Sequence, residues 1–299
     1  MALATEHLHP PVWDVTARRL WTVSWKFVRT KPLGAYGAVV IILMALVAIF
    51  ADVLAPYDIY TINQRWQFQA PTLAHWFGTD EFGRDVLSRI MFGARLALFI
   101  GLASSLVGAT AGAFIGVASA YMGGKVDLWT QRVMDILLAF PLLVLALAIV
   151  AVLGRSTSNL VLAIAIPVIP RMARIVRSSA LSAKENVYVE AARAIGGSHV
   201  RIMCQHIVPN IMAPYLIVLT VQLGSAILTE ASLSFLGLGT AEPTSSWGLM
   251  LSGGAPMFAE KAPWLAIFPG LAISLAVFSF NLLGDSLRDV LDPKLRHRS

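Results

Sequence analysis

Six long stretches without Asp, Glu, Lys or Arg constrain the fold of this chain more than any other feature. They cover residues 32–51, 96–124, 136–154, 156–170, 202–229 and 262–284. A helix needs about 20 apolar residues to cross a bilayer, and backbone groups cannot stay unpaired in lipid. No alternation of period two, which a membrane β-barrel requires, is present. We therefore predict an all-α membrane protein with six transmembrane helices.

The composition supports this prediction. Of the 299 residues, 57% are hydrophobic and 13% are charged, whereas soluble domains average about 45–50% and about 25%. These values exclude a disordered chain, a disulfide-rich secreted domain and an ordinary soluble enzyme. The single cysteine, Cys204, cannot form an internal disulfide. The net charge of +6 is explained first by membrane topology, so we predict no nucleic-acid partner.

The distribution of basic residues predicts the orientation in the membrane. With the amino terminus inside, 17 of the 23 lysines and arginines fall on the inner side. The exceptions are Arg65, Arg84, Arg89, Arg95, Arg155 and Lys261. This asymmetry follows the positive-inside rule and predicts that both termini are cytoplasmic.

The chain divides into three parts. Residues 1–31 carry Trp21, Trp25 and Val28 at helical spacing among basic residues. This pattern predicts a cytoplasmic amphipathic helix in the headgroup region, with a disordered basic tail as the alternative. Residues 32–290 form one six-span domain, with an outer loop at about 57–92 and a cytoplasmic loop at about 180–209. Residues 291–299 form a cytoplasmic tail.

Motifs for chemistry are absent from the sequence, while one packing motif is present. We find no zinc-binding pattern, nucleophile elbow or complete P-loop, so neither catalytic nor metal-binding residues are expected. Gly108, Gly112 and Gly116 are spaced four apart within the second span. Small residues at this spacing let another helix approach closely.

The longest cytoplasmic connection carries an informative local pattern. Residues 190–195 are good helix formers, Gly196 and Gly197 interrupt them, and Ser198 can cap a second helix. This pattern predicts a helix, a glycine turn and another helix. Its residues alone are equally compatible with a surface connector.

These residues resemble the EAA motif of permeases from binding-protein-dependent ABC importers. Glu190, Ala191, Ala192, Gly196 and Pro209 match the motif in type and spacing. Before the proline, His206 and Val208 stand where Ile and Leu are usual in the family. The resemblance implies that this loop forms a coupling helix, which docks into a groove on an ATPase subunit.

Further blocks resemble the C-type subunit of dipeptide, oligopeptide and nickel permeases. They are residues 75–89, 233–239, 246–248 and 280–293. The first block predicts a folded outer loop that contacts the binding protein or gates entry. Its candidate residues are Trp76, Gly78, Asp80, Gly83, Arg84 and Asp85, which favour tight turns and local ion pairs.

Glu230 is a candidate for the translocation pathway, because ionisable residues near spans are functional by default. Two alternatives stay open for this residue. It can lie at the water interface, or it can pair with a neighbouring helix.

The resemblance implies a type I ABC importer transmembrane domain in the bacterial cytoplasmic membrane. The implied partners are a homologous B-type permease chain, two ABC ATPase subunits and an extracytoplasmic solute-binding protein. This chain is expected to bind no cofactor, while the partner ATPases use ATP and magnesium. The implied cargo is a di- or oligopeptide, with nickel chelates, opines and short glycans left open. A secondary transporter would need inverted repeats, and a membrane-embedded enzyme would need catalytic groups; we find neither.

Overall fold

The computed structural model describes residue 25 and residues 27–241, 243–253 and 260–291. Within these residues the regular structure is helical, apart from one isolated β-bridge between Thr79 and Asp85. Most of the predicted amphipathic segment 1–31 and nearly all of the predicted tail 291–299 lie outside the described residues. Residues 27–30 of the first segment are helical.

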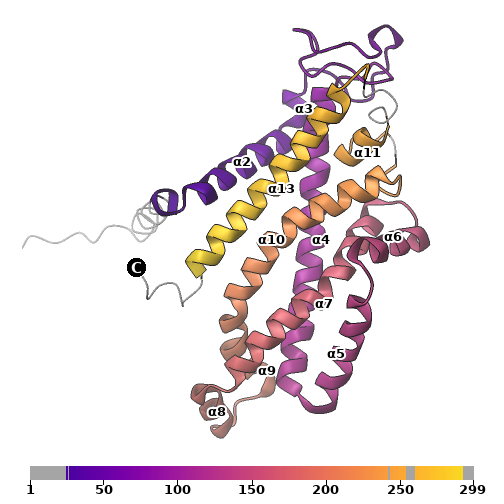
Figure 1. Cartoon of the computed structure of the whole chain (residues 1–299). Coiled ribbons are helices and arrows are strands. Elements are labelled where there is room, and N and C mark those ends of the chain that lie inside the picture. The colour runs from indigo at the N-terminus through magenta and orange to yellow at the C-terminus, as the bar shows by residue number, and fades with distance from the viewer. Residues whose placement is uncertain (1–24, 26, 242, 254–259, 292–299) are drawn as a thin grey trace, which may run out of the picture.

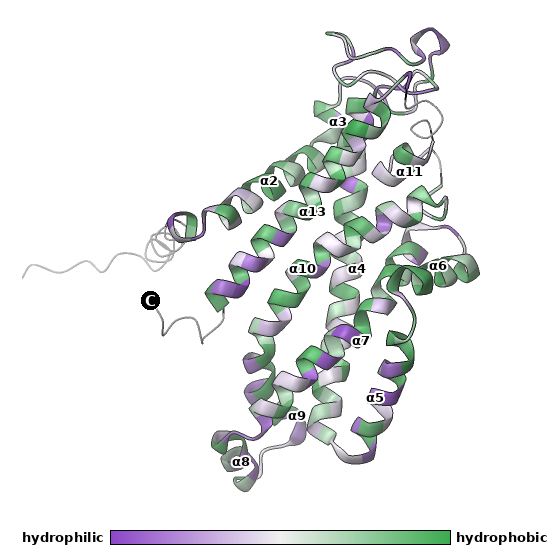
Figure 2. Ribbon diagram, viewed as in Figure 1, coloured by the Kyte–Doolittle hydropathy of each residue, from purple (hydrophilic) through white to green (hydrophobic). Residues whose placement is uncertain are grey.

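Within the described residues, five helices are long and apolar enough to cross a membrane, and a bent pair is a sixth candidate. The five are α2 (Pro32–Ile49), α4 (Val86–Met122), α7 (Thr157–Lys184), the segment His199–Phe235, most of which is α10 (Val208–Phe235), and α13 (Trp264–Leu291). The bent pair is α5 (Gly124–Leu138) with α6 (Leu142–Leu153). Figure 1 shows these helices as one elongated bundle. Apolar residues cover its middle, and polar residues gather towards both ends (Figure 2). The predicted all-α fold is confirmed.

The third predicted span, 136–154, is not a single straight helix. α5 and α6 meet at 89° across residues 139–141. Pro141 stands at the break, where its missing N–H and fixed φ end the hydrogen-bond ladder. The twelve residues of α6 extend over only about 18 Å, so α6 alone cannot cross a hydrocarbon core of about 30 Å.

The fourth predicted span, 156–170, is too short. α7 continues through Pro167 and Pro170 to Lys184. The prediction stopped at the first arginines, but an arginine in a helix is tolerated when a carboxylate lies beside it. Arg177 in α7 donates from Nε to Asp127 of α5 at 2.6 Å.

The pair α4 and α7 packs along the predicted glycine stripe. A Cβ atom added at Gly108, Gly112 or Gly116 would lie 2.5–2.6 Å from a backbone carbonyl oxygen of α7. Only residues without a side chain allow the two backbones to approach this closely. The two helices lie side by side in Figure 1 and form the centre of the bundle.

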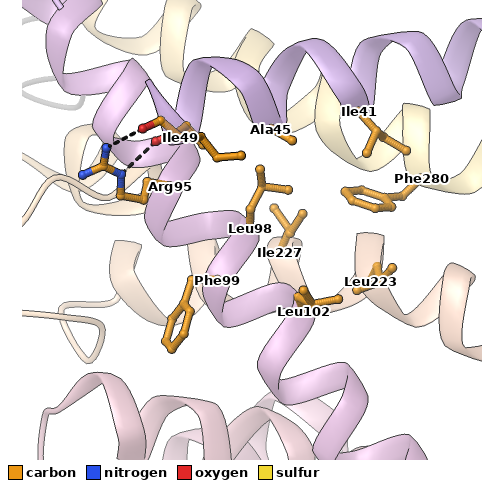
Figure 3. Close-up of a pocket in the computed structure, with 11 residues that line it drawn as sticks. Ile41, Ala45, Ile49, Arg95, Leu98, Phe99, Leu102, Leu223, Ile227 and Phe280 are labelled. Carbon is orange, nitrogen blue, oxygen red and sulfur yellow. Dashed lines mark hydrogen bonds between the residues drawn. The ribbon is translucent and has the colours of Figure 1, made fainter. Parts of the chain in front are cut away.

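An apolar groove of about 430 Å³ lies between α2, α4, α10 and α13 (Figure 3). Its lining residues include Ile41, Leu98, Phe99, Leu223 and Phe280. Arg95 of α4 lies at one end and donates to the carbonyl oxygens of Ala48 and Ile49 at 2.8 and 3.2 Å. α4 begins at Val86, directly after its cap Asp85, rather than at the predicted residue 96. Arg95 is accommodated within the helix by these partners on α2. The last residues of the predicted outer loop, 57–92, therefore form the first turns of α4.

Candidate functional site

Residues 185–202, called the α8 loop here, form a helix–turn–helix at one end of the bundle (Figure 1). α8 (Val187–Ala194) and α9 (His199–Ile202) are joined by the two glycines. The Ser198 hydroxyl accepts a hydrogen bond from the backbone N–H of Arg201 and caps α9. This is the local structure that the sequence predicts.

The turn depends on the backbone of Gly196. Its φ is +80°, a conformation that residues with a side chain rarely adopt. Its N–H donates to the Arg193 carbonyl at 3.0 Å, and that of Gly197 donates to Ala192 at 2.9 Å. These two bonds form a Schellman motif, which ends α8. A Cβ on Gly196 would meet nothing within 4 Å, so a larger residue would strain only the backbone.

The motif residues of the α8 loop point mainly to solvent. Glu190, Ala191 and Gly196 are exposed, and Ala192 is half-buried. Sequence reasoning missed the apolar residues around them, Val187, Ile195 and Val200, which are 80%, 87% and 65% exposed. Their signal was present, because they are large apolar residues outside every predicted span. Three large apolar side chains are thus exposed within fourteen consecutive residues of this loop.

The opposite side of the α8 loop is buried. Val189 of α8 and Ile202 of α9 are 0% and 1% exposed. They lie in one hydrophobic cluster with Tyr121 of α4 and Met172 of α7. The loop is therefore fixed to the central helix pair on one side and presents its apolar residues on the other.

Pro209 lies apart from the glycine turn, at the start of α10. The five residues Met203–Ile207 form a π-helical turn between α9 and α10. Pro209 has no N–H to donate, and the π-helical turn directly before it changes the hydrogen-bond pattern at this point. Residues 199–235 form one long helical segment that connects the α8 loop to the bundle.

A second candidate region, the loop of residues 55–85, lies at the opposite end of the bundle (Figure 1). Asp80 organises it: one carboxylate oxygen accepts from the backbone N–H groups of Phe82 and Arg84, both at 2.9 Å. The other accepts from Nε of Arg84 at 2.6 Å. Gly83, inside this turn, has a φ of +73°. The predicted tight turn with a local ion pair is present.

Asp85 joins this loop to α4. Its carboxylate accepts from the backbone N–H of Ser88 at 2.8 Å and so caps α4. The other carboxylate oxygen lies 2.9 Å from Nδ1 of the buried His75. Gly78 lies against Trp264 of α13, whose indole N–H donates to the Thr79 carbonyl at 3.0 Å. The loop is a folded element held on two helices.

The tip of the 55–85 loop is apolar and exposed. Trp76 is 67% exposed, and its indole N–H donates to the carbonyl of Leu73 at 3.1 Å. Leu73 is 97% exposed. Farther from the tip, burial raises the pKa of Glu81 above its usual value, and the neighbouring Asp80 acts in the same direction.

Glu230 of α10 is buried rather than placed at a water interface. It is 1% exposed, and its carboxylate accepts from the hydroxyls of Ser234 at 2.7 Å and Ser246 at 2.9 Å. Ser246 directly precedes α11 (Trp247–Ser252). The contact holds this short helix on α10. Of the two alternatives left open for Glu230, the structure therefore agrees with pairing to a neighbouring helix rather than with a place at the water interface.

Within the described residues, no group of three or more His, Cys, Asp and Glu side chains is placed to hold a metal ion.

Comparison with known proteins identifies the family. The family described as "Binding-protein-dependent transport system inner membrane component" matches residues 108–297. The "N-terminal TM domain of oligopeptide transport permease C" matches residues 19–71.

Two relatives match almost the whole chain. The chain is 42% identical to the dipeptide transport system permease protein DppC of Alkalihalophilus pseudofirmus, over 96% of this chain and 94% of the relative. It is also 42% identical to the glutathione transport system permease protein GsiD of Escherichia coli O1:K1, over 96% and 95%. These relatives are permease subunits and not enzymes. The chain belongs to the family of binding-protein-dependent transport system inner membrane components.

Proposed function

We propose that this chain is the C-type permease subunit of an ATP-driven importer for small peptides. The names of its relatives support a peptide cargo, since a dipeptide and glutathione are both short peptides. The C-type assignment is supported by the match of residues 19–71 to an oligopeptide permease C domain.

The chain works in a complex with a homologous B-type permease, two ATPase subunits that use ATP and magnesium, and an extracytoplasmic solute-binding protein. The complex lies in the bacterial cytoplasmic membrane, with both termini and the α8 loop in the cytoplasm. The distribution of Lys and Arg supports this orientation. The 55–85 loop then lies outside.

The observation that carries the coupling role is the contrast within the α8 loop between apolar residues buried against the bundle and apolar residues exposed to solvent. Its apolar residues Val187, Ile195 and Val200 are free to enter a groove on an ATPase subunit, while Val189 and Ile202 fix the loop to the bundle. Closure of the ATPase dimer on ATP then moves this loop. The permease pair changes from inward-facing to outward-facing, because the ATPases bind the two states differently.

We assign docking of the binding protein to the 55–85 loop. Its folded base keeps Trp76 and Leu73 in a fixed, exposed position. Large exposed aromatic side chains are typical anchors of protein interfaces. Loss of this contact, as in Trp76→Ala, is expected to weaken stimulation of the ATPase by the binding protein.

Gly196→Val tests the coupling assignment. A positive φ at a β-branched residue costs about 1–3 kcal/mol, which distorts the turn that orients α8. Gly154→Val is the matched control: Gly154 has a φ of +85°, and a Cβ there also meets nothing within 4 Å. Gly154 lies between α6 and α7, away from the α8 loop.

The two variants are compared for abundance in the membrane, copurification of the ATPase subunits and peptide uptake. We expect similar abundance, with copurification and uptake lost only in Gly196→Val. Equal copurification and equal uptake in both variants would contradict the coupling role of the α8 loop.

A further inference from the structure

Tyr121 lies where α4 meets the α8 loop. It is the penultimate residue of α4 and only 8% exposed. Its hydroxyl lies 2.8 Å from Nδ1 of His199, the first residue of α9. Seventy-eight positions separate the two residues in the sequence, so this hydrogen bond joins distant segments directly.

Two cations lie near the ring of Tyr121. The guanidinium carbon of Arg193, at the end of α8, is 5.5 Å from the ring centroid, and Nζ of Lys184 is 5.8 Å from it. Both distances fall within the range of about 6 Å for cation–π attraction. Lys184 also donates to the carbonyl oxygens of Ala120 and Tyr121 at 3.1 and 2.8 Å. It thereby satisfies the free carbonyl end of α4.

These contacts reach both sides of the glycine turn. Arg193 precedes Gly196, and His199 follows Gly197. A hinge is free to flex only when its two flanks are not fixed to one common body. Because Tyr121 contacts both flanks, the turn cannot open without breaking a contact to α4.

We infer that Tyr121 is a positioning residue that locks the α8 loop to α4. A force applied to α8 then moves the central helix pair instead of bending the loop alone. This role rests on the proposed function of the α8 loop, but nothing in the family match assigns it. Tyr121 itself touches neither ATP nor cargo.

The hydrogen bond can be removed without removing the hydrophobic anchor. Tyr121→Phe keeps the ring and both cation contacts, and Val189 and Ile202 remain buried beside it. His199→Leu removes the bond from the other side, whereas His199→Asn keeps a polar atom near the position of Nδ1. Tyr215→Phe is the matched control, because the Tyr215 hydroxyl also bonds α4, at Thr110 with 3.0 Å. Thr110 precedes Tyr121 by about three helical turns of α4, and this bond does not involve a residue of the α8 loop.

The first measurement needs no partner subunit. A nitroxide label on the native Cys204, which is exposed and lies just after α9, reports loop mobility by electron paramagnetic resonance in the full chain in nanodiscs. Mobility is expected to rise in Tyr121→Phe and His199→Leu, and to stay at the unsubstituted level in His199→Asn and Tyr215→Phe. Equal mobility in Tyr121→Phe and the unsubstituted chain would overturn the inference.

The second measurement uses the assembled importer in proteoliposomes. We expect Tyr121→Phe to keep the ATPase subunits bound and to lower peptide uptake per ATP hydrolysed by about two- to tenfold, the effect of one neutral hydrogen bond. His199→Asn restores the ratio relative to His199→Leu. Unchanged uptake per ATP in Tyr121→Phe would overturn the positioning role. If even the unsubstituted chain binds no ATPase, the proposed function fails, while label mobility still decides the contact.

Discussion

Replacing Gly112 by alanine tests the contact on which the bundle is built. Gly112 is the middle residue of the stripe through which α4 meets α7. The substitution adds one methyl group and leaves charge and hydrogen bonding unchanged. Apart from the difference in helix propensity, its effect therefore measures the space between the two helices.

The structure gives the size of the clash. A Cβ on Gly112 would lie 2.6 Å from the carbonyl oxygen of Ile169 and 2.8 Å from Cβ of Met172. Ordinary contact begins at 3.4 Å, so the helices must separate locally by 3.4 − 2.6 Å, or about 0.8 Å. Overpacking of this kind costs about 1–3 kcal/mol. The higher helix propensity of alanine offsets about 1 kcal/mol, which leaves a net loss of about 0–2 kcal/mol. Relative to a control that gains the same propensity without a clash, the loss stays at about 1–3 kcal/mol.

The free energy of unfolding is measured on the purified chain in mixed micelles by titration with a denaturing detergent. Gly270→Ala in α13 is the control, because a Cβ there meets nothing within 4 Å. We expect the control to be as stable as the unsubstituted chain or up to about 1 kcal/mol more stable. If Gly112→Ala matched Gly270→Ala in stability, the close approach of α4 and α7 would be refuted.

Two further predictions concern the ends of the bundle. Burial raises the pKa of Glu81 above 4.5, so its contribution to stability is present below about pH 4.5 and is lost as the pH rises through the raised pKa. Compared with the unsubstituted chain, Glu81→Gln is therefore expected to make the 55–85 loop more resistant to proteolysis at pH 7 but not at pH 4. If the variant and the unsubstituted chain were equally resistant at pH 7, the burial effect would be contradicted. The second prediction concerns orientation in the membrane and uses a chain from which Cys204 has been removed. In intact cells an impermeant thiol reagent should label Ala74→Cys, whereas it should label Ala194→Cys only after the cells are permeabilised. The reverse pattern would overturn the proposed topology.

The local structure of the α8 loop could be predicted because its signals are local. Gly196 takes the positive φ that its place after a helical run predicts, and Ser198 caps the next helix. The folded base of the 55–85 loop was predictable for the same reason, since Asp80 and Arg84 are close in sequence. In each case the interacting groups lie within a few residues of one another.

Contacts between distant segments could not be predicted in this way. The apolar residues 136–154 do not reveal that the chain bends by 89° within this segment. The length of α7 depends on Asp127 lying beside Arg177, fifty positions away. Glu230 is buried because Ser246 folds back over α10. A single sequence shows the charges, but only the fold shows which of them are paired.

Both candidate regions are attached to the same helix. Asp85 caps the first turn of α4 beneath the 55–85 loop, and Tyr121 holds the α8 loop in its last turn. The 37 residues of α4 extend over about 55 Å, which is enough to cross the bilayer and reach both surfaces. Along its middle, the glycine stripe braces α4 against α7, so the pair resists bending. A displacement of either loop must therefore move α4 and α7 together or break a contact to them. Coupling between the two ends of the bundle thus requires the close packing of α4 on α7 that Gly112→Ala tests.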